Sequence, residues 1–178
     1  MNAAWAASHP KASPLVTFSL DDDGMLMWLS DRSPAALAFA KDYLLSHTAP
    51  ANKASDPKGT YSTTVTASGL TKVYTGSAVD RLFGAPTGDS HAPDLVGIAQ
   101  YGVVYTGNVK KIAEHGGDAP ADRDVPLVVS GRGAPHHTVS TTPVQTTQIA
   151  PTILRLLGIN PHALQAVQIE HTRPLPKL

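Results

Sequence analysis

The sequence predicts a mixed α/β fold, and two kinds of apolar pattern carry that prediction. Short apolar runs, of which 15–20 and 94–99 are examples, have the length and composition of strands. Residues 33–47 and 147–157 instead repeat their apolar side chains at helical spacing. A chain of 178 residues is long enough to enclose one ordinary apolar core.

Composition excludes several classes of function. The 14 Lys and Arg residues balance the 14 Asp and Glu residues, so the net charge does not attract the chain to nucleic acid or to an anionic membrane. The absence of Cys excludes disulfides, thiol catalysis and Cys-ligated zinc. No apolar run reaches the roughly 18 residues of a spanning helix, and residues 1–13 show no signal-peptide pattern. We therefore expect no nucleic-acid or membrane partner, and the compartment stays open.

The first half of the chain begins with a predicted strand, turn and buried run. Residues 15–20 read as a strand, the acidic residues 21–24 as a turn, and 25–29 as a buried apolar run. A helix is expected next, because Ser33 can cap its first turn and Pro34 suits the first helical position. Its apolar residues recur at helical spacing up to about residue 47.

The following segment is polar and then becomes regular again. Residues 48–72 predict a long loop, which could border a substrate entrance or be an ordinary disordered insert. Ser77 can start a short helix that ends before Gly84. Residues 94–99 and 103–105 are predicted to pair as two strands, arranged as a hairpin.

The second half predicts one buried strand and one helix. The continuous apolar run within 125–131 suits a strand covered on both faces. A helix is expected from about residue 147 or 148 to Leu157, with Pro151 in its first turn and Gly158 ending it. Because its apolar residues share one face, this helix is expected to pack on a sheet; they are Ile149, Ile153, Leu156 and Leu157.

Most candidate ligand residues fit a surface role better than a metal site. The acidic turn starting at Asp21 lacks the Gly and Glu that a calcium loop needs at its sixth and twelfth positions. Adjacent histidines in an extended segment point to opposite sides, so one metal rarely takes both. Surface or structural roles are therefore expected for the adjacent pair His136 and His137, for His91 with Asp94, and for His162 and His171.

His115 has a different setting. It precedes Gly116 and Gly117, which let the backbone approach a bound group closely. A neutral imidazole is a natural zinc ligand, and Glu114 or a backbone carbonyl could orient its second nitrogen. Catalytic zinc needs about three protein ligands, so the residues alone leave a ligand and an ordinary loop histidine equally open.

Several segments together resemble the carboxy-terminal part of alkaline-phosphatase-superfamily hydrolases, in particular the type I phosphodiesterase/nucleotide pyrophosphatase group. The late segments keep the family's order of His-Gly loop, core strand, polar connection and Pro-Thr-Ile-Leu helix. They are KIAEHGG at 111–117, DVPLVVSG at 124–131, TTQIAPTIL at 146–154 and LG at 157–158. The earlier segments DDDGMLMWLSDR at 21–32 and PDLVGI at 93–98 are also similar, and NAAWAA at 2–7 looks like the interior of a family helix.

The resemblance implies a metal-dependent phosphoric-ester hydrolase of the phosphodiesterase/nucleotide pyrophosphatase or phosphatase type. In that family two zinc ions activate a Thr or Ser nucleophile, and His115 matches the ligand of the late His-Gly loop. No segment resembles the nucleophile motif or the upstream Asp and His ligands, so we expect no catalytic residue here and no activity from this chain alone. The substrate would be a small phosphate ester.

The resemblance also implies a division of the chain. Residues 1–110 would be an added, cap-like subdomain with its connection, and 111–178 would return to an alkaline-phosphatase-like mixed sheet flanked by helices. Exposed sheet edges predict self-association. Two alternatives remain, a non-catalytic interaction protein and a fragment of a sulfatase-like hydrolase, although that branch needs a modified Cys or Ser nucleophile and Cys is absent.

Overall fold

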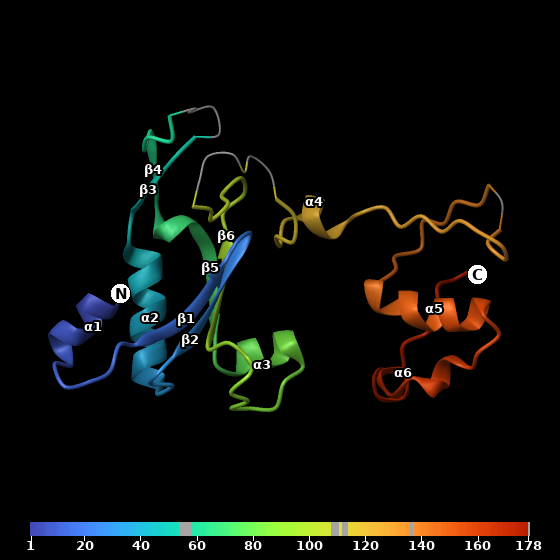
Figure 1. Ribbon diagram of the computed structural model, residues 1–178, viewed down its shortest axis with the longest axis horizontal. Helices are drawn as coiled ribbons and strands as arrows, with labels where there is room; N and C mark the ends of the chain where they lie inside the picture. The colour runs from blue at the N-terminus through green and yellow to red at the C-terminus, as the bar shows by residue number, and fades with distance from the viewer. Residues whose placement is uncertain (54–57, 108–110, 112–113, 136, 178) are drawn as a thin grey trace. The chain divides into compact units, whose positions relative to one another are not determined.

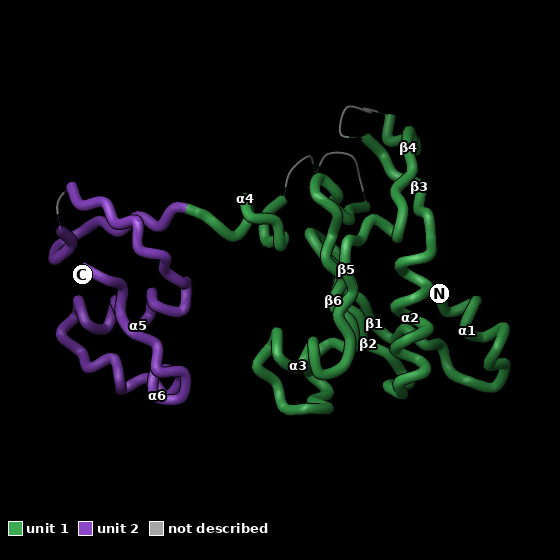
Figure 2. The backbone as a smooth tube through the Cα atoms, turned by 180° about the vertical axis from the view of Figure 1, so that it is seen from behind, with its two compact units in different colours: residues 1–125 green, residues 126–178 purple. Residues whose placement is uncertain are grey.

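The computed structural model describes residues 1–53, 58–107, 111, 114–135 and 137–177. The chain forms two compact units, residues 1–125 and residues 126–178 (Figure 2). Among the described residues, the first unit holds two antiparallel sheets with helices and the second holds only helical elements. The predicted mixed α/β class is therefore confirmed. The predicted division between residues 110 and 111 concerns the roles of the segments and stays a prediction.

A hairpin opens the main sheet, and the sequence predicts its first strand and its turn. Strands β1 (Val16–Asp21) and β2 (Gly24–Leu29) pair antiparallel across the acidic turn. Alternate residues of β2 are buried, namely Met25, Met27 and Leu29, so one face of the hairpin belongs to the core. The buried apolar run expected at 25–29 is thus one half-buried strand, whose other side chains are partly exposed.

Helix α2 (Pro34–Ser46) lies against that face of the sheet, and α1 (Asn2–Ser8) lies beside α2 (Figure 1). Helix α2 begins as predicted, because the Ser33 hydroxyl accepts a hydrogen bond from the Ala36 amide at 3.2 Å. Helix α1 contributes the buried Trp5. The core combines side chains from these helices and the sheet: Trp5, Leu15, Met25, Met27, Leu29, Ala36, Ala40, Leu44, Leu70, Val73 and Leu95.

The other two strands of the sheet correct the predicted hairpin of 94–99 with 103–105. Strand β6 (Leu95–Ala99) pairs with β2 on one side and with β5 (Leu70–Thr75) on the other, giving the antiparallel order β1-β2-β6-β5. Residues 103–105 form no strand. The sequence pattern hides β5 because the register shifts between Leu70 and Lys72, which places the buried Leu70 and Val73 three residues apart.

The predicted loop at 48–72 is more regular than expected. Its described residues form the two-stranded sheet of β3 (Ala49–Ala51) and β4 (Thr63–Val65), then the 3-10 turn η1 (Ala67–Gly69) and the start of β5. Part of the loop, 54–57, lies outside the described residues. Helix α3 (Ser77–Phe83) is where the sequence places it, and Gly84 ends it at a φ of +59°. The Ser77 side chain, however, makes no capping hydrogen bond.

The predicted buried strand at 125–131 is wrong. After helix α4 (Pro120–Arg123) the chain runs on without a strand, and Val125 and Val128 are 58% and 84% exposed. An apolar run becomes a buried strand only where neighbouring strands pair with it, and no described residue supplies that partner.

The helix predicted near residue 147 is confirmed, but its packing is not. The 3-10 turn η2 (Thr146–Gln148) leads into α5 (Ile149–Leu156), and Gly158 follows at a φ of +73°. Ile153 and Leu157 are 50% and 67% exposed, so the apolar face meets no sheet within its unit.

Helix α5 instead buries its opposite side. The Thr152 hydroxyl donates to the Gln148 carbonyl at 2.6 Å and accepts from the Leu175 amide at 2.7 Å. The turn η3 (Pro161–Ala163) and helix α6 (Gln165–Glu170) complete the unit. Within the described part of the chain, no helix is both long and apolar enough to cross a membrane.

Candidate functional site

The His115 loop is attached to the turn of the first hairpin by one lysine. The Lys111 ammonium contacts the Asp22 carboxylate at 2.6 Å and also forms an ion pair with Glu114. The Glu114 side chain is only 11% exposed, whereas that of Asp22 is 56% exposed. The acidic turn, expected to be solvated, therefore anchors the loop through Lys111 while remaining partly open to water.

The His115 imidazole points into solvent. Its side chain is 98% exposed, and Nε2 lies 3.7 Å from Glu114 Oε1, beyond hydrogen-bond distance. The same Glu114 oxygen accepts from the His115 backbone amide at 3.1 Å. Glu114 thus shapes the backbone of the loop and leaves the ring free, which differs from the expected orientation of the ring by this carboxylate.

Two different structural features favour glycine at positions 116 and 117 of the loop. Gly116 has a φ of +102°, a backbone region that favours glycine. A Cβ on Gly117 would lie 2.7 Å from an Asp122 carboxylate oxygen. A Cβ on Gly116 would meet nothing within 4 Å, so only Gly117 shows a close approach, and it is to a carboxylate of the same chain. The expected approach of this backbone to a bound group stays a prediction.

Carboxylates gather beside this loop. Burial raises the pKa of the Asp23 carboxyl, and the charges of Asp22 and Asp122 raise it further, while Lys111 and His115 oppose them. Asp23 Oδ2 is buried and has no hydrogen-bond partner among the described residues. The loop that carries His115 therefore lies beside the carboxylates of Asp22, Asp23 and Asp122.

The residues present do not make a zinc site on their own. Among the residues that the structure describes, no three His, Asp or Glu side chains converge in a metal-binding arrangement. The Glu114 carboxylate is engaged in an ion pair with Lys111, so the imidazole of His115 is the ligand that the loop offers. Catalytic zinc takes about three protein ligands. This chain can contribute a ligand, and any activation of water or of a nucleophile requires further ligands.

The remaining candidate histidines have no ligand partners. His91 Nδ1 contacts Asp89 at 2.9 Å and its side chain is 95% exposed, so the predicted neighbour Asp94 is not its partner. Asp94 is buried instead against Leu29 and Arg32. The other described histidines of this candidate set, His137, His162 and His171, are exposed, and His136 lies outside the described residues.

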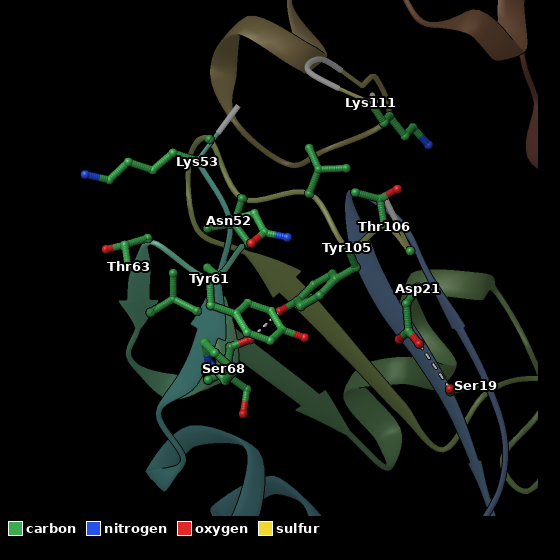
Figure 3. A pocket seen from close by; sticks show the side chains of 18 of the residues that line it. Ser19, Asp21, Asn52, Lys53, Tyr61, Thr63, Ser68, Tyr105, Thr106 and Lys111 are labelled. Carbon is green, nitrogen blue, oxygen red and sulfur yellow. Dashed lines mark hydrogen bonds between the residues drawn. The ribbon is translucent and has the colours of Figure 1, made fainter. Parts of the chain in front are cut away.

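Sequence reasoning missed a groove elsewhere in the first unit. It has a volume of about 880 Å³ and lies between the β3–β4 sheet, the end of β1 and the segment 102–107 (Figure 3). Tyr61 and Tyr105 both line it. The interpretation of residues 48–72 as the border of an entrance was the nearest indication, because β3 and β4 form one wall.

Comparisons with known proteins add no further identification. No family model, no curated protein and no solved structure matches the chain. Functional inference therefore depends on the residues themselves and on their arrangement.

Proposed function

We propose that this chain is the carboxy-terminal portion of a metal-dependent phosphoric-ester hydrolase, of the phosphodiesterase/nucleotide pyrophosphatase or phosphatase type. His115 would supply one ligand of its two-zinc site. The observation that carries the proposal is the exposed imidazole on an anchored Gly-Gly loop, within motifs that follow the order of that family. A ligand position requires a ring that is open to an approaching ion, and His115 meets that condition.

Unpartnered apolar surfaces in the second unit support a larger parent fold. Residues 125–130 show no backbone hydrogen bonds among the described residues, although their composition suits a buried strand. Helix α5 leaves Ile153 and Leu157 exposed on one face. In the family that this sequence resembles, the corresponding segments form a core strand and a helix packed on the central sheet. Additional strands would cover both surfaces and remove their apolar area from water.

The proposal predicts that the 178-residue chain alone does not turn over substrate. A single imidazole holds a divalent ion weakly, and without anionic ligands it does not assemble a two-metal clamp for phosphoryl transfer. Purified chain with added zinc should leave an aryl phosphodiester unhydrolysed. Turnover that His115→Ala abolishes would show a complete site within these residues and would contradict this part of the proposal.

Zinc binding to His115 can be tested without activity. In an NMR titration, zinc should perturb the His115 ring before the other histidine rings, and His115→Ala should remove that first perturbation. His91→Ala is the matched control, because His91 is equally exposed and has one carboxylate neighbour. Equal perturbation of all exposed histidines would mean that zinc does not distinguish the Gly-Gly loop.

The decisive experiment concerns the coding sequence upstream of Met1. We expect an in-frame Thr nucleophile motif with Asp and His ligands, and the protein expressed from that longer frame should hydrolyse aryl phosphodiesters. His115→Ala in the longer protein should lower its zinc content and its activity together. A longer frame without those motifs, or full zinc content after the substitution, would overturn the proposal.

A non-catalytic interaction protein is the second candidate, and the exposed apolar run at 125–129 favours it. An extended apolar segment can dock on a partner without any metal. This candidate predicts a folded chain whose melting temperature is unchanged by zinc or by a chelator. It also predicts no nucleophile motif upstream, so the same sequencing experiment separates the two candidates.

A further inference from the structure

The groove of the first unit is built around a tyrosine that is fixed at both ends. The Tyr105 backbone amide donates to the Asp22 carbonyl at 2.9 Å, and its hydroxyl donates to the Ser68 carbonyl at 2.8 Å. These bonds join the hairpin turn on one side to η1 on the other. The Tyr105 ring is therefore a preorganised part of the groove wall (Figure 3).

A second aromatic ring points into the same groove. Tyr61 comes from the segment before β4 and is 72% exposed, which leaves a large part of its ring available to a ligand. Figure 3 shows the rings of Tyr61 and Tyr105 both directed into the groove. Such rings present a face with negative electrostatic character, to which cations are attracted.

The carboxylate of Asp21 also lines the groove and has no cationic partner among the described residues. Its only described side-chain contact is the Ser19 hydroxyl, which donates to Oδ2 at 3.1 Å. Burial raises the pKa of the Tyr105 hydroxyl to about 12, and the negative charge of Asp21 contributes to that rise. The Asp21 carboxylate and the Tyr105 ring line the same groove, so one ligand in it can contact both.

The two lysines of the groove do not compensate this charge. The Lys111 ammonium is bound by two carboxylates, those of Asp22 and Glu114. The Lys53 side chain extends away from the groove (Figure 3). The inner surface consequently combines one carboxylate with two aromatic rings, and no described ammonium group is directed inward.

We propose that this groove binds a small organic cation, an amine or quaternary ammonium with an apolar body, against Tyr61, Tyr105 and Asp21. The aromatic faces attract the cation, and the exposed Asp21 carboxylate adds a Coulombic attraction that salt and solvent screen in part. The volume of about 880 Å³ leaves room for an apolar substituent beside the charged group. The inference concerns the first unit alone and does not rest on the proposed hydrolase function.

The test is an NMR titration of the full chain with benzyltrimethylammonium. Benzyl alcohol is the neutral comparison and phenyl phosphate the anionic one, all at the same ionic strength. We expect the cation to bind at least about fivefold more tightly than benzyl alcohol, with the largest shifts at Tyr61 and Tyr105. Tyr61→Leu keeps an apolar side chain but removes the aromatic face. This variant should lower the affinity for the cation about two- to fivefold.

Matched variants separate the groove from general surface effects. Asp21→Asn preserves the shape of the side chain but removes its charge. It should lower the affinity for the cation severalfold and leave the affinity for benzyl alcohol unchanged. Asp42→Asn and Tyr101→Leu alter exposed residues that do not line the groove, so they should leave both affinities unchanged. Equal affinity for the cation and benzyl alcohol, tighter binding of phenyl phosphate, or equal losses in the control variants would overturn the proposal. A wild-type amide spectrum in each variant shows that the fold is retained.

Discussion

Replacing Asp94 by alanine removes a buried carboxylate that links two strands of the main sheet. The residue is 7% exposed and accepts a hydrogen bond from the Leu29 amide at 2.7 Å. It also forms an ion pair with Arg32, whose side chain is 38% exposed. Leaving the Leu29 donor unsatisfied costs about 1–3 kcal/mol, and the solvent-screened pair adds about 0–1 kcal/mol. The free energy of unfolding should therefore fall by about 1–4 kcal/mol.

Urea unfolding followed by tryptophan fluorescence measures this loss, because Trp28 lies in β2 and Trp5 is buried in the same core. Asp94→Asn retains an oxygen that can accept from Leu29, so it should lose less stability than the alanine variant. Asp42→Ala, an exposed carboxylate on α2, should change stability by less than about 0.5 kcal/mol. If Asp94→Ala were as stable as Asp42→Ala, the buried carboxylate would not hold the sheet as argued.

Three further predictions follow from packing, titration and exposure. Gly97→Ala places a Cβ 2.9 Å from Leu70, so its thermal unfolding midpoint should fall by the equivalent of about 1–3 kcal/mol, whereas Gly107→Ala meets no neighbour and should match the wild type. The Tyr105 pKa of about 12 exceeds the ordinary value of 10.0, so its stabilisation is complete below pH 10 and is lost as the pH rises toward 12. Tyr105→Phe should remove that decline in alkaline unfolding curves; an unchanged decline would assign it to other groups. Sedimentation velocity should detect self-association, and Val128→Lys, at an 84% exposed position, should reduce it; a monomeric wild type would refute this expectation.

Much of the first unit follows from local sequence rules. Ser33 and Pro34 define the start of α2, and the predicted turn at 21–24 follows the predicted strand β1. These features depend on neighbouring residues, whose backbone preferences and hydrogen bonds act over short distances. Local patterns therefore suffice to find β1, the turn and α2, whereas they indicate β2 only as a buried apolar run.

The errors arise where pairing between distant segments decides the structure. The bulge near Lys72 breaks the alternation of β5, and the run at 125–129 has strand composition without a described strand beside it. At the candidate site, spacing identifies His115 as a loop residue flanked by glycines. Spacing could not reveal that Lys111 joins this loop to Asp22, because that contact depends on the three-dimensional position of the hairpin turn.

The position of β6 has a consequence for biosynthesis. This strand lies between β2 and β5 although it is the last of the four to be translated. A nascent polypeptide that has not yet reached Leu95 holds an early hairpin and a separate strand without the central ladder that joins them. The edges of β2 and β5 that face β6 therefore stay unpaired until β6 has left the ribosome, and unpaired strand edges of this kind favour aggregation.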